Sequence, residues 1–252
     1  MLIDTHCHLD DPSLVARLPH VLAVGRSAGV VKYLVPGVHP EGWPVIAGLA
    51  QEYPEIYPAF GLHPMYADFS KAELLPELGH YLLRAVAVGE IGLDYASPSI
   101  SREIQQEVFR TQVRLAVSLK LPVMIHCRGA FRDLLDILGE EHVQRVGGVM
   151  HAFSGSPEVA GECLRLGLFI SVAGTVTYKN AVKPLEVVRS VPLDRLLLET
   201  DAPDMTPEPY RGRPNEPGFI VETARKVAEI KGVTMTEVAR ITTGNAERLF
   251  RI

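Results

Sequence analysis

The segment Leu2–His8, with the sequence LIDTHCH, begins as an apolar strand and ends with two histidines two positions apart. Because side chains alternate between the two faces of a strand, we expect His6 and His8 to project to one side and Cys7 to the other. Two imidazoles on one face suit a divalent cation that accepts nitrogen ligands. A single strand-end histidine is more often a hydrogen-bonded core residue, so a metal site requires that other segments bring ligands to the same point.

Seven further apolar or β-branched runs follow, and each precedes a helix-like segment: 31–37, 56–63, 85–93, 122–127, 148–152, 168–173 and 195–200. Runs of this length, bounded by glycine and proline, are typical of strands buried on both faces of a parallel sheet. Their ends recur at intervals of roughly 25–35 residues, the size of one βα unit. The sequence therefore predicts a single-domain (β/α)8 TIM barrel over residues 1–252, with additional C-terminal helices. An open doubly wound sheet is the alternative, although it would usually show a glycine fingerprint after the first strand.

Helix signals lie between these runs. Ser156 precedes a first-turn proline, and Ser70 and Thr234 each stand three residues before a glutamate, which is the pattern of a capping box. Apolar spacing predicts a helix over residues 105–120. After the last run, the Pro-rich segment 202–217 is predicted to be a loop long enough to cover a site. Asn245 is predicted to cap a last short helix.

Composition excludes several classes of protein. The chain has 252 residues, 47% of them hydrophobic, and a formal net charge of −5, which argues against tight non-specific binding along a duplex. Its three cysteines form neither a disulfide framework nor a CxxC pattern, and they favour a reducing compartment. No run of about 18 apolar residues and no secretory signal pattern is present. We therefore expect a soluble, cytoplasmic protein without membrane contact, and no obligate protein partner is indicated.

Polar residues stand at the ends of six of the eight expected strands. In a barrel, functional groups lie at the C-terminal ends of the strands, so these side chains should meet at one mouth. They are poor core residues, because burying a polar group without a partner costs several kcal/mol. We expect the following residues to converge: His6, His8, His63, Glu90, His126, His151 and Asp201.

This set is large enough for two divalent cations, with Mg, Mn or Zn as candidates. A zinc-like ion takes about three protein ligands and keeps one position open, so six ligands with one bridging carboxylate suit two ions. Glu90 is the expected bridge, because the fourth strand lies between the other ligand groups. The predicted division is His6, His8, Glu90 and Asp201 on one ion, and Glu90, His126 and His151 on the other. Glu90 and Asp201 are the predicted catalytic residues, and Asp201 is the predicted general base.

Other polar residues near the mouth have two open interpretations. Asp4 and Glu199 either orient the ligands or are simply buried and hydrogen-bonded. His63 either binds substrate or packs a loop. Arginine matches phosphate geometry, so substrate-binding roles are predicted for some of the group Arg128, Arg211, Arg213 and Asn215, with solvated loop residues as the alternative.

Motifs along the whole chain resemble those of the TatD family of metal-dependent deoxyribonucleases, within the amidohydrolase-like barrel enzymes. The matching segments are residues 3–10 (IDTHCHLD), 61–64 (GLHP), 89–95 (GEIGLDY), 122–133 (PVMIHCRGAFRD), 153–155 (FSG), 196–203 (LLLETDAP) and 211–217 (RGRPNEP). One departure is Ala152, where many members carry cysteine. The resemblance implies a (β/α)8 fold and hydrolysis of phosphodiesters, often from the 3′ end of single-stranded DNA or RNA. It also implies metal ligands at His6, His8, Glu90, His126, His151 and Asp201.

Three classes of function follow from these patterns. The leading hypothesis is a two-metal phosphodiester hydrolase that acts on DNA ends. The resemblance implies, more specifically, a 3′–5′ exodeoxyribonuclease on single strands, with RNA ends as a further substrate. A small-molecule or aminoacyl-ester hydrolase is the second. Related barrels of that type often bridge their metals with a modified lysine, whereas here the nearest lysines, Lys71 and Lys120, belong to helices. A non-catalytic, metal-dependent nucleic-acid-binding protein is the third.

Overall fold

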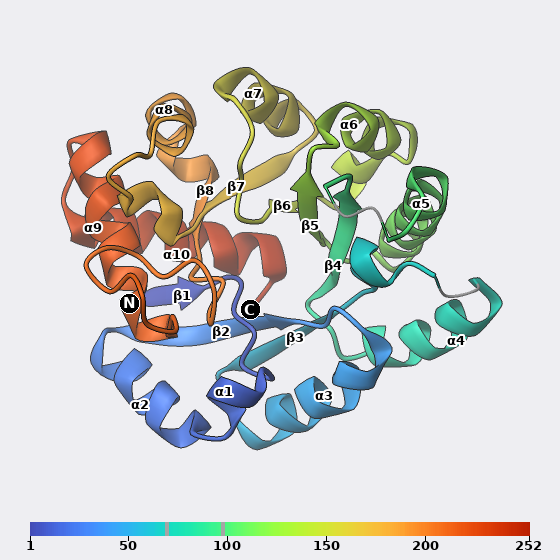
Figure 1. Cartoon of the computed structure of the whole chain (residues 1–252), viewed down its shortest axis with the longest axis horizontal. Coiled ribbons are helices and arrows are strands. Elements are labelled where there is room, and N and C mark those ends of the chain that lie inside the picture. Colours follow the sequence, from blue (N-terminus) through green and yellow to red (C-terminus); the bar gives the residue numbers. More distant parts are fainter. Residues whose placement is uncertain (69–70, 97–98) are drawn as a thin grey trace.

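The computed structural model describes residues 1–68, 71–96 and 99–252, with the backbone alone for residues 71–75. Eight parallel strands follow one another around a barrel, and each pairs with the next in the sequence (Figure 1). Strand order does not reverse anywhere along the described sheet, which excludes the open doubly wound alternative and confirms the predicted barrel. The strands are β1 (Leu2–Asp4), β2 (Val30–Pro36), β3 (Ile56–Phe60), β4 (Ala87–Asp94), β5 (Val123–Arg128), β6 (Gly148–Met150), β7 (Leu168–Val172) and β8 (Leu196–Leu198).

Helices surround the strands and connect each one to the next (Figure 1). They are α1 (Pro12–Val15), α2 (Leu18–Ser27), α3 (Trp43–Glu52), α4 (Lys71–Leu82), α5 (Arg102–Leu119), α6 (Phe131–Glu140), α7 (Pro157–Arg165), α8 (Lys183–Ser190), α9 (Ile220–Lys231) and α10 (Met235–Phe250). Within the described residues, no helix is long and apolar enough to cross a bilayer.

The barrel interior explains why polar residues follow the strands. Each strand contributes one inward side chain to a buried apolar layer: Ile3, Leu34, Ala59, Ala87, Met124, Val149, Phe169 and Leu197. Because side chains alternate along a strand, the residue two positions further on also points inward. On β5, β6 and β8 these next residues are His126, His151 and Glu199. The polar layer therefore lies directly above the apolar plug, at the C-terminal end of the barrel.

The seam between β8 and β1 closes the barrel with few hydrogen bonds. Both strands are shorter than predicted, since β1 ends at Asp4 and β8 at Leu198. Beyond them, the Thr5 N–H donates to the Leu198 carbonyl at 3.1 Å. The Asp4 carboxylate accepts hydrogen bonds from the backbone N–H and the hydroxyl of Thr200. Burial raises the pKa of Asp4 to about 7, against the opposing effect of its Thr200 hydrogen bonds.

Replacing Thr200 with valine removes the hydroxyl while keeping the shape of the side chain. We expect a loss of about 1–3 kcal/mol in the free energy of unfolding, because the buried Asp4 carboxyl loses a donor and the Ala202 N–H loses an acceptor. Urea denaturation would measure this change. The control is Thr242→Val, because that buried hydroxyl donates to the Val238 carbonyl within its own helix. Equal losses in the two variants would contradict a role for Thr200 at the seam.

The predicted helix starts are confirmed where the structure describes them. The Ser156 and Thr234 side chains accept hydrogen bonds from the N–H groups three residues later. Ser70 lies outside the described residues. The helix predicted over residues 105–120 begins three residues earlier, because Ser101 caps α5.

The prediction that Asn245 caps a last short helix is wrong. One continuous helix, α10, runs through this position. The Asn245 amide instead donates to the carbonyls of Leu193 and Leu196, at 3.0 and 2.8 Å. The residue therefore attaches the C-terminal helix to the start of β8.

Candidate metal centre

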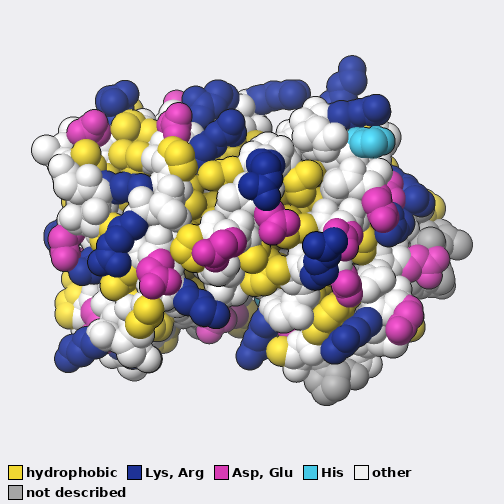
Figure 2. All heavy atoms as spheres, turned by 90° about the horizontal axis from the view of Figure 1, so that it is seen from above, with side chains coloured by type: hydrophobic (Ala, Val, Ile, Leu, Met, Phe, Trp, Pro, Cys, Tyr) yellow, Lys and Arg dark blue, Asp and Glu magenta, His cyan; other side chains and the backbone are white. Residues whose placement is uncertain are grey.

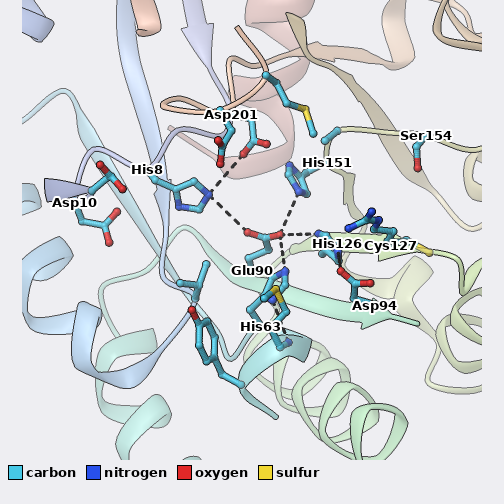
Figure 3. A pocket seen from close by; sticks show the side chains of 18 of the residues that line it. His8, Asp10, His63, Glu90, Asp94, His126, Cys127, His151, Ser154 and Asp201 are labelled. Atoms are coloured by element: carbon cyan, nitrogen blue, oxygen red, sulfur yellow. Dashed lines mark hydrogen bonds and ion pairs between the residues drawn. The ribbon is translucent and has the colours of Figure 1, made fainter. Parts of the chain in front are cut away.

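A pocket of about 690 Å³ opens at the C-terminal ends of the strands, and its lining includes Glu90 and four histidines. Figure 3 shows Glu90 near the centre, with His8, His63, His126 and His151 directed at its carboxylate. His6 lies beneath them, fully buried and stacked on the His151 ring with a centroid separation of 3.8 Å. All seven residues predicted to converge on the mouth are therefore neighbours in the structure.

One carboxylate oxygen of Glu90 faces the histidines that follow β1. Its Oε2 atom lies 3.3 Å from His6 Nε2 and 3.9 Å from His8 Nε2. Asp201 Oδ1 approaches the same two nitrogens, at 3.6 Å each. His6 lies next to Asp201 because the His6 carbonyl accepts a hydrogen bond from the Asp201 N–H across the seam between β8 and β1.

The other oxygen of Glu90 faces a second group of histidines. Its Oε1 atom lies 3.1 Å from both His126 Nδ1 and His151 Nε2. His63 Nε2 approaches the same oxygen at 3.4 Å. The single carboxylate therefore lies between two separate sets of nitrogen atoms.

The spacing and chemistry of these atoms fit metal ligands. Donor atoms placed tetrahedrally about 2.0–2.2 Å from an ion lie about 3.3–3.6 Å apart, close to most of the separations around Glu90. Both ring nitrogens of His6 are buried without a hydrogen-bond partner in the described chain, which is costly unless something else occupies them. Three groups of described residues have donor atoms close enough to hold one ion: His6 with His8 and Glu90, His6 with His151 and Glu199, and His63 with Glu90 and His126. The predicted ligands His6, His8, Glu90, His126 and His151 are all among them, and Asp201 lies beside the first group.

The histidines and carboxylates of the cluster shift one another's pKa values. Burial, together with the nearby charge of His151, lowers the pKa of His6 and keeps it neutral. Burial would also lower the pKa of His8, but its hydrogen bond to Asp201 and the charges of Asp201 and Glu90 raise it to about 9. Despite its burial, His151 has a pKa well above the ordinary value, because Glu90 and Glu199 lie beside it. The surrounding histidines in turn lower the pKa values of Glu90 and Asp201, against the opposing effect of burial. Protons on two histidines therefore compensate two carboxylates.

Two further carboxylates orient the second group of histidines. Asp94 Oδ2 lies 3.3 Å from His126 Nε2, the ring nitrogen that faces away from Glu90. Glu199 Oε1 lies 3.4 Å from His151 Nδ1 in the same relation. A carboxylate on the far nitrogen of a ligating histidine fixes its tautomer and raises its basicity. Glu199 therefore lies where it can orient a ligand histidine, whereas the Asp4 carboxylate accepts hydrogen bonds from the His6 N–H and from the N–H and hydroxyl of Thr200.

The role of Asp94 was missed in the sequence, although its position at the end of β4 was a usable signal. We expect Asp94→Asn to weaken metal binding by about 10–100-fold, because an amide holds the His126 proton less firmly. Competition with a chelating dye would measure the affinity. Asp133→Asn is the control, since that carboxylate accepts hydrogen bonds from Tyr95 and Gln106 outside the pocket. Unchanged affinity in Asp94→Asn would contradict the orienting role.

His63 differs from the other histidines in its hydrogen bonding. Its Nδ1 atom accepts a hydrogen bond from the Met65 N–H at 3.2 Å. A ring nitrogen that accepts cannot carry the proton, so neutral His63 holds its proton on Nε2, the atom that faces Glu90. This arrangement suits a hydrogen-bond donor in the pocket better than a metal ligand.

The three arginines considered as substrate-binding residues have different surroundings. Arg128 lines the pocket, and its guanidinium makes no hydrogen bond or ion pair to any described residue. Arg211 stacks on the Tyr178 ring at 4.2 Å and lies within 4.0 Å of Glu208. Arg213 lies over Tyr210 and Phe219. Only Arg128 is therefore both in the pocket and free for an anion.

The position of Asn215 does not support its predicted role in substrate binding. The residue is fully buried, and its amide donates to the carbonyls of Thr200 and Asp204 at 2.8 and 2.7 Å. Its side-chain oxygen accepts a hydrogen bond from the Glu216 N–H. All of its polar atoms are used within the loop, which Asn215 holds against the end of β8.

Together the barrel and its histidine–carboxylate cluster define a metal-dependent hydrolase. The family model described as "TatD related DNase" matches residues 3–251. The chain is 44% identical to the uncharacterized metal-dependent hydrolase YabD of Bacillus subtilis, over the full length of both. It is 34% identical to the human deoxyribonuclease TATDN3, covering 99% of this chain and 94% of that protein. The crystal structure of the TatD homologue YJJV from Escherichia coli superposes with a TM-score of 0.94 at 36% identity, covering 100% of this chain and 98% of the other. This chain belongs to the TatD family.

Proposed function

We propose that residues 1–252 form one hydrolase domain that removes nucleotides from the 3′ end of single-stranded DNA, with two divalent cations at the cluster. The observation that carries the proposal is the position of Glu90, whose two oxygens face two separate histidine groups. One carboxylate shared between two ligand sets is the arrangement of two-metal phosphoesterases. The name of the human relative, a deoxyribonuclease, supports the choice of substrate.

The proposed ligands divide as the sequence predicted. His6, His8, Asp201 and Glu90 would hold one ion, and Glu90, His126 and His151 the other. Bound Mg, Mn or Zn supplies Lewis acidity, which lowers the pKa of water and neutralises charge on a phosphoryl group. His63 is left to donate its Nε2 proton to a substrate oxygen.

Asp201 and Arg128 would carry the remaining steps. Asp201 stays anionic near neutral pH because its pKa is lowered, so it can accept the proton of the attacking water. Arg128, whose guanidinium has no partner among the described residues, would bind a phosphate at the pocket wall.

The surface and pocket suit strand ends better than long duplexes. Figure 2 shows basic and acidic side chains intermingled over one face of the molecule. A protein that follows a duplex needs many phosphate-neutralising cations together, whereas this chain has a net charge of −5. A pocket of about 690 Å³ has room for the terminal part of a strand.

The test uses chelator-stripped protein, to which Mg, Mn or Zn is added back in turn. The substrate is a single-stranded DNA oligomer with either a free or a blocked 3′ end. We expect metal-dependent, stepwise shortening of the free-ended strand alone. Hydrolysis of simple esters or lactones without any cleavage of oligomers would instead favour the small-molecule hydrolase. Binding of the oligomer without any turnover would favour the binding protein.

Metal binding is expected to release protons. In the metal-free protein His8 and His151 hold protons at pH 7, because both pKa values are raised. Ligating histidines must be neutral, so loading both metal sites should release about two protons. For the same reason, the affinity for metal should increase as the pH rises towards about 9, the pKa of His8. Titration calorimetry in buffers of different ionisation enthalpy would count the protons. Heats that do not depend on the buffer would contradict this charge assignment.

We place the reaction in the cytoplasm. All three cysteines are free thiols, and two of them are buried, as expected for a protein that works in a reducing compartment.

A further inference from the structure

One wall of the pocket is apolar and takes no part in the metal centre. Met65 and Tyr66 lie in the short 3-10 helix η2 (Pro64–Tyr66), directly after His63. They are 47% and 41% exposed, and both line the same pocket as Glu90. Two adjacent large apolar side chains beside a cluster of charged groups indicate a surface that a ligand covers.

The Tyr66 ring is held in place before any ligand binds. It makes an edge-to-face contact with His39, with ring centroids 5.0 Å apart and planes at 64°. A second edge-to-face contact joins it to His63, at 6.5 Å and 63°. Since its orientation is already fixed, the ring loses little conformational freedom when it binds a flat partner.

The neighbouring strands place this ring at a definite position relative to the reaction. Tyr66 follows β3, Glu90 lies in β4, and Arg128 ends β5; these three strands are adjacent in the sheet. His63 and His126, which both point at Glu90 in Figure 3, connect the three positions, with their rings 4.5 Å apart. The pocket therefore presents an aromatic surface, a carboxylate–histidine cluster and the Arg128 cation in that order.

We propose that Tyr66, with Met65 beside it, stacks on the nucleobase next to the phosphodiester that is cleaved, while Arg128 binds an adjacent phosphate. The inference rests on the proposed nuclease function and identifies the substrate class as strands with an intact terminal base. Every base has a π face, so stacking of this kind tolerates any sequence but discriminates against an abasic end. Tyr66 is then a specificity-determining residue for the reaction at Glu90.

The test compares Tyr66→Ala and Tyr66→Phe on matched oligomers. One oligomer carries a normal base at both nucleotides that flank the terminal phosphodiester, and two others carry an abasic residue at one of them. We expect Tyr66→Ala to raise KM about tenfold on the normal oligomer, with little change in kcat. On the abasic oligomer that lacks the base on which Tyr66 stacks, Tyr66→Ala and the wild type should have the same KM. Tyr66→Phe keeps the ring and should behave as the wild type. Met235→Ala is the control for truncation of an exposed side chain and should leave KM unchanged, because Met235 is 38% exposed at the start of α10, away from the pocket.

A binding measurement separates stacking from turnover. The probe is a dinucleotide that contains 2-aminopurine and a methylene group in place of the bridging oxygen, so it cannot be cleaved. Wild type and Tyr66→Phe should quench its fluorescence, and Tyr66→Ala should not. If the wild type cleaves DNA but Tyr66→Ala affects normal and abasic oligomers equally, the stacking proposal alone is wrong. If the wild type cleaves no oligomer at all, the proposed function and this inference both fail.

Discussion

The Glu90→Gln variant is expected to lose at least about 10³-fold in kcat and to bind fewer than two metal ions per chain. Glutamine keeps the size of the side chain but removes the negative charge that faces His6 and His8 on one side and His126 and His151 on the other. An amide also offers only one oxygen, so it cannot serve both histidine groups at once. Both sites should therefore be weakened by a single change.

Metal content by mass spectrometry and steady-state cleavage of a DNA oligomer would measure the two effects. Glu247→Gln is the matched control, because its carboxylate makes a surface ion pair with Lys32 at 3.0 Å, far from the pocket. The melting temperature of each metal-free protein would show whether the fold survives. Full metal content together with normal turnover in Glu90→Gln would falsify the bridging role.

The strand pattern predicted most of the candidate centre, because one physical rule connects sequence to position. Met124 and Val149 face the barrel interior, so alternation places His126 and His151 on the same side, one layer higher. The rule does not hold on β1, where alternation counted from the inward Ile3 would turn Thr5 and Cys7 towards the interior. The chain bends at residues 5 and 6, and His6 and His8 face Glu90 instead. Backbone hydrogen bonds to both neighbouring strands hold this segment at the mouth.

Alternation along strands does not predict which contacts the side chains of the loops make. Asn215 and Arg211 belong to a Pro-rich segment whose path depends on tertiary contacts. These contacts engage both side chains, since Asn215 bonds to the carbonyls of Thr200 and Asp204, and Arg211 stacks on the Tyr178 ring. Residue type alone suggested phosphate binding for both of them. Tyr66 was not among the predicted site residues, because its residue type gave no indication of a function. Only the folded chain places it in the same pocket as Glu90.

The orienting carboxylates were only partly accessible to sequence reasoning. Glu199 lies two residues before Asp201, and this spacing suggested a deeper position on the same face. Asp94 lies four residues after Glu90 on β4, but its partner is on β5, so the contact depends on the register between the two strands. The pairing sets Asp94 beside Arg128, and the Asp94 side chain reaches back to His126. A single sequence does not specify that register.

Asp201→Asn is expected to lower kcat by about 10²–10⁴-fold, the range associated with a general base. Asparagine is the appropriate replacement, because Asp201 has a φ of 57°, a left-handed conformation that asparagine tolerates and alanine does not. The variant can keep the backbone hydrogen bond to His6 and a side-chain oxygen near His8, while it cannot accept a proton. The matched control is Asp136→Asn, a surface carboxylate paired with Arg132.

The pH profile separates loss of a base from loss of a metal. Because the pKa of Asp201 lies below its ordinary value of 3.8, its base form persists throughout the neutral range, and its own titration should not limit wild-type turnover there. Without that base, turnover of the metal-loaded variant should depend on hydroxide and rise about tenfold per pH unit between pH 6 and about 8. A flat profile with reduced metal content would mean that Asp201 acts only as a ligand. A flat profile with normal turnover would remove it from the reaction altogether.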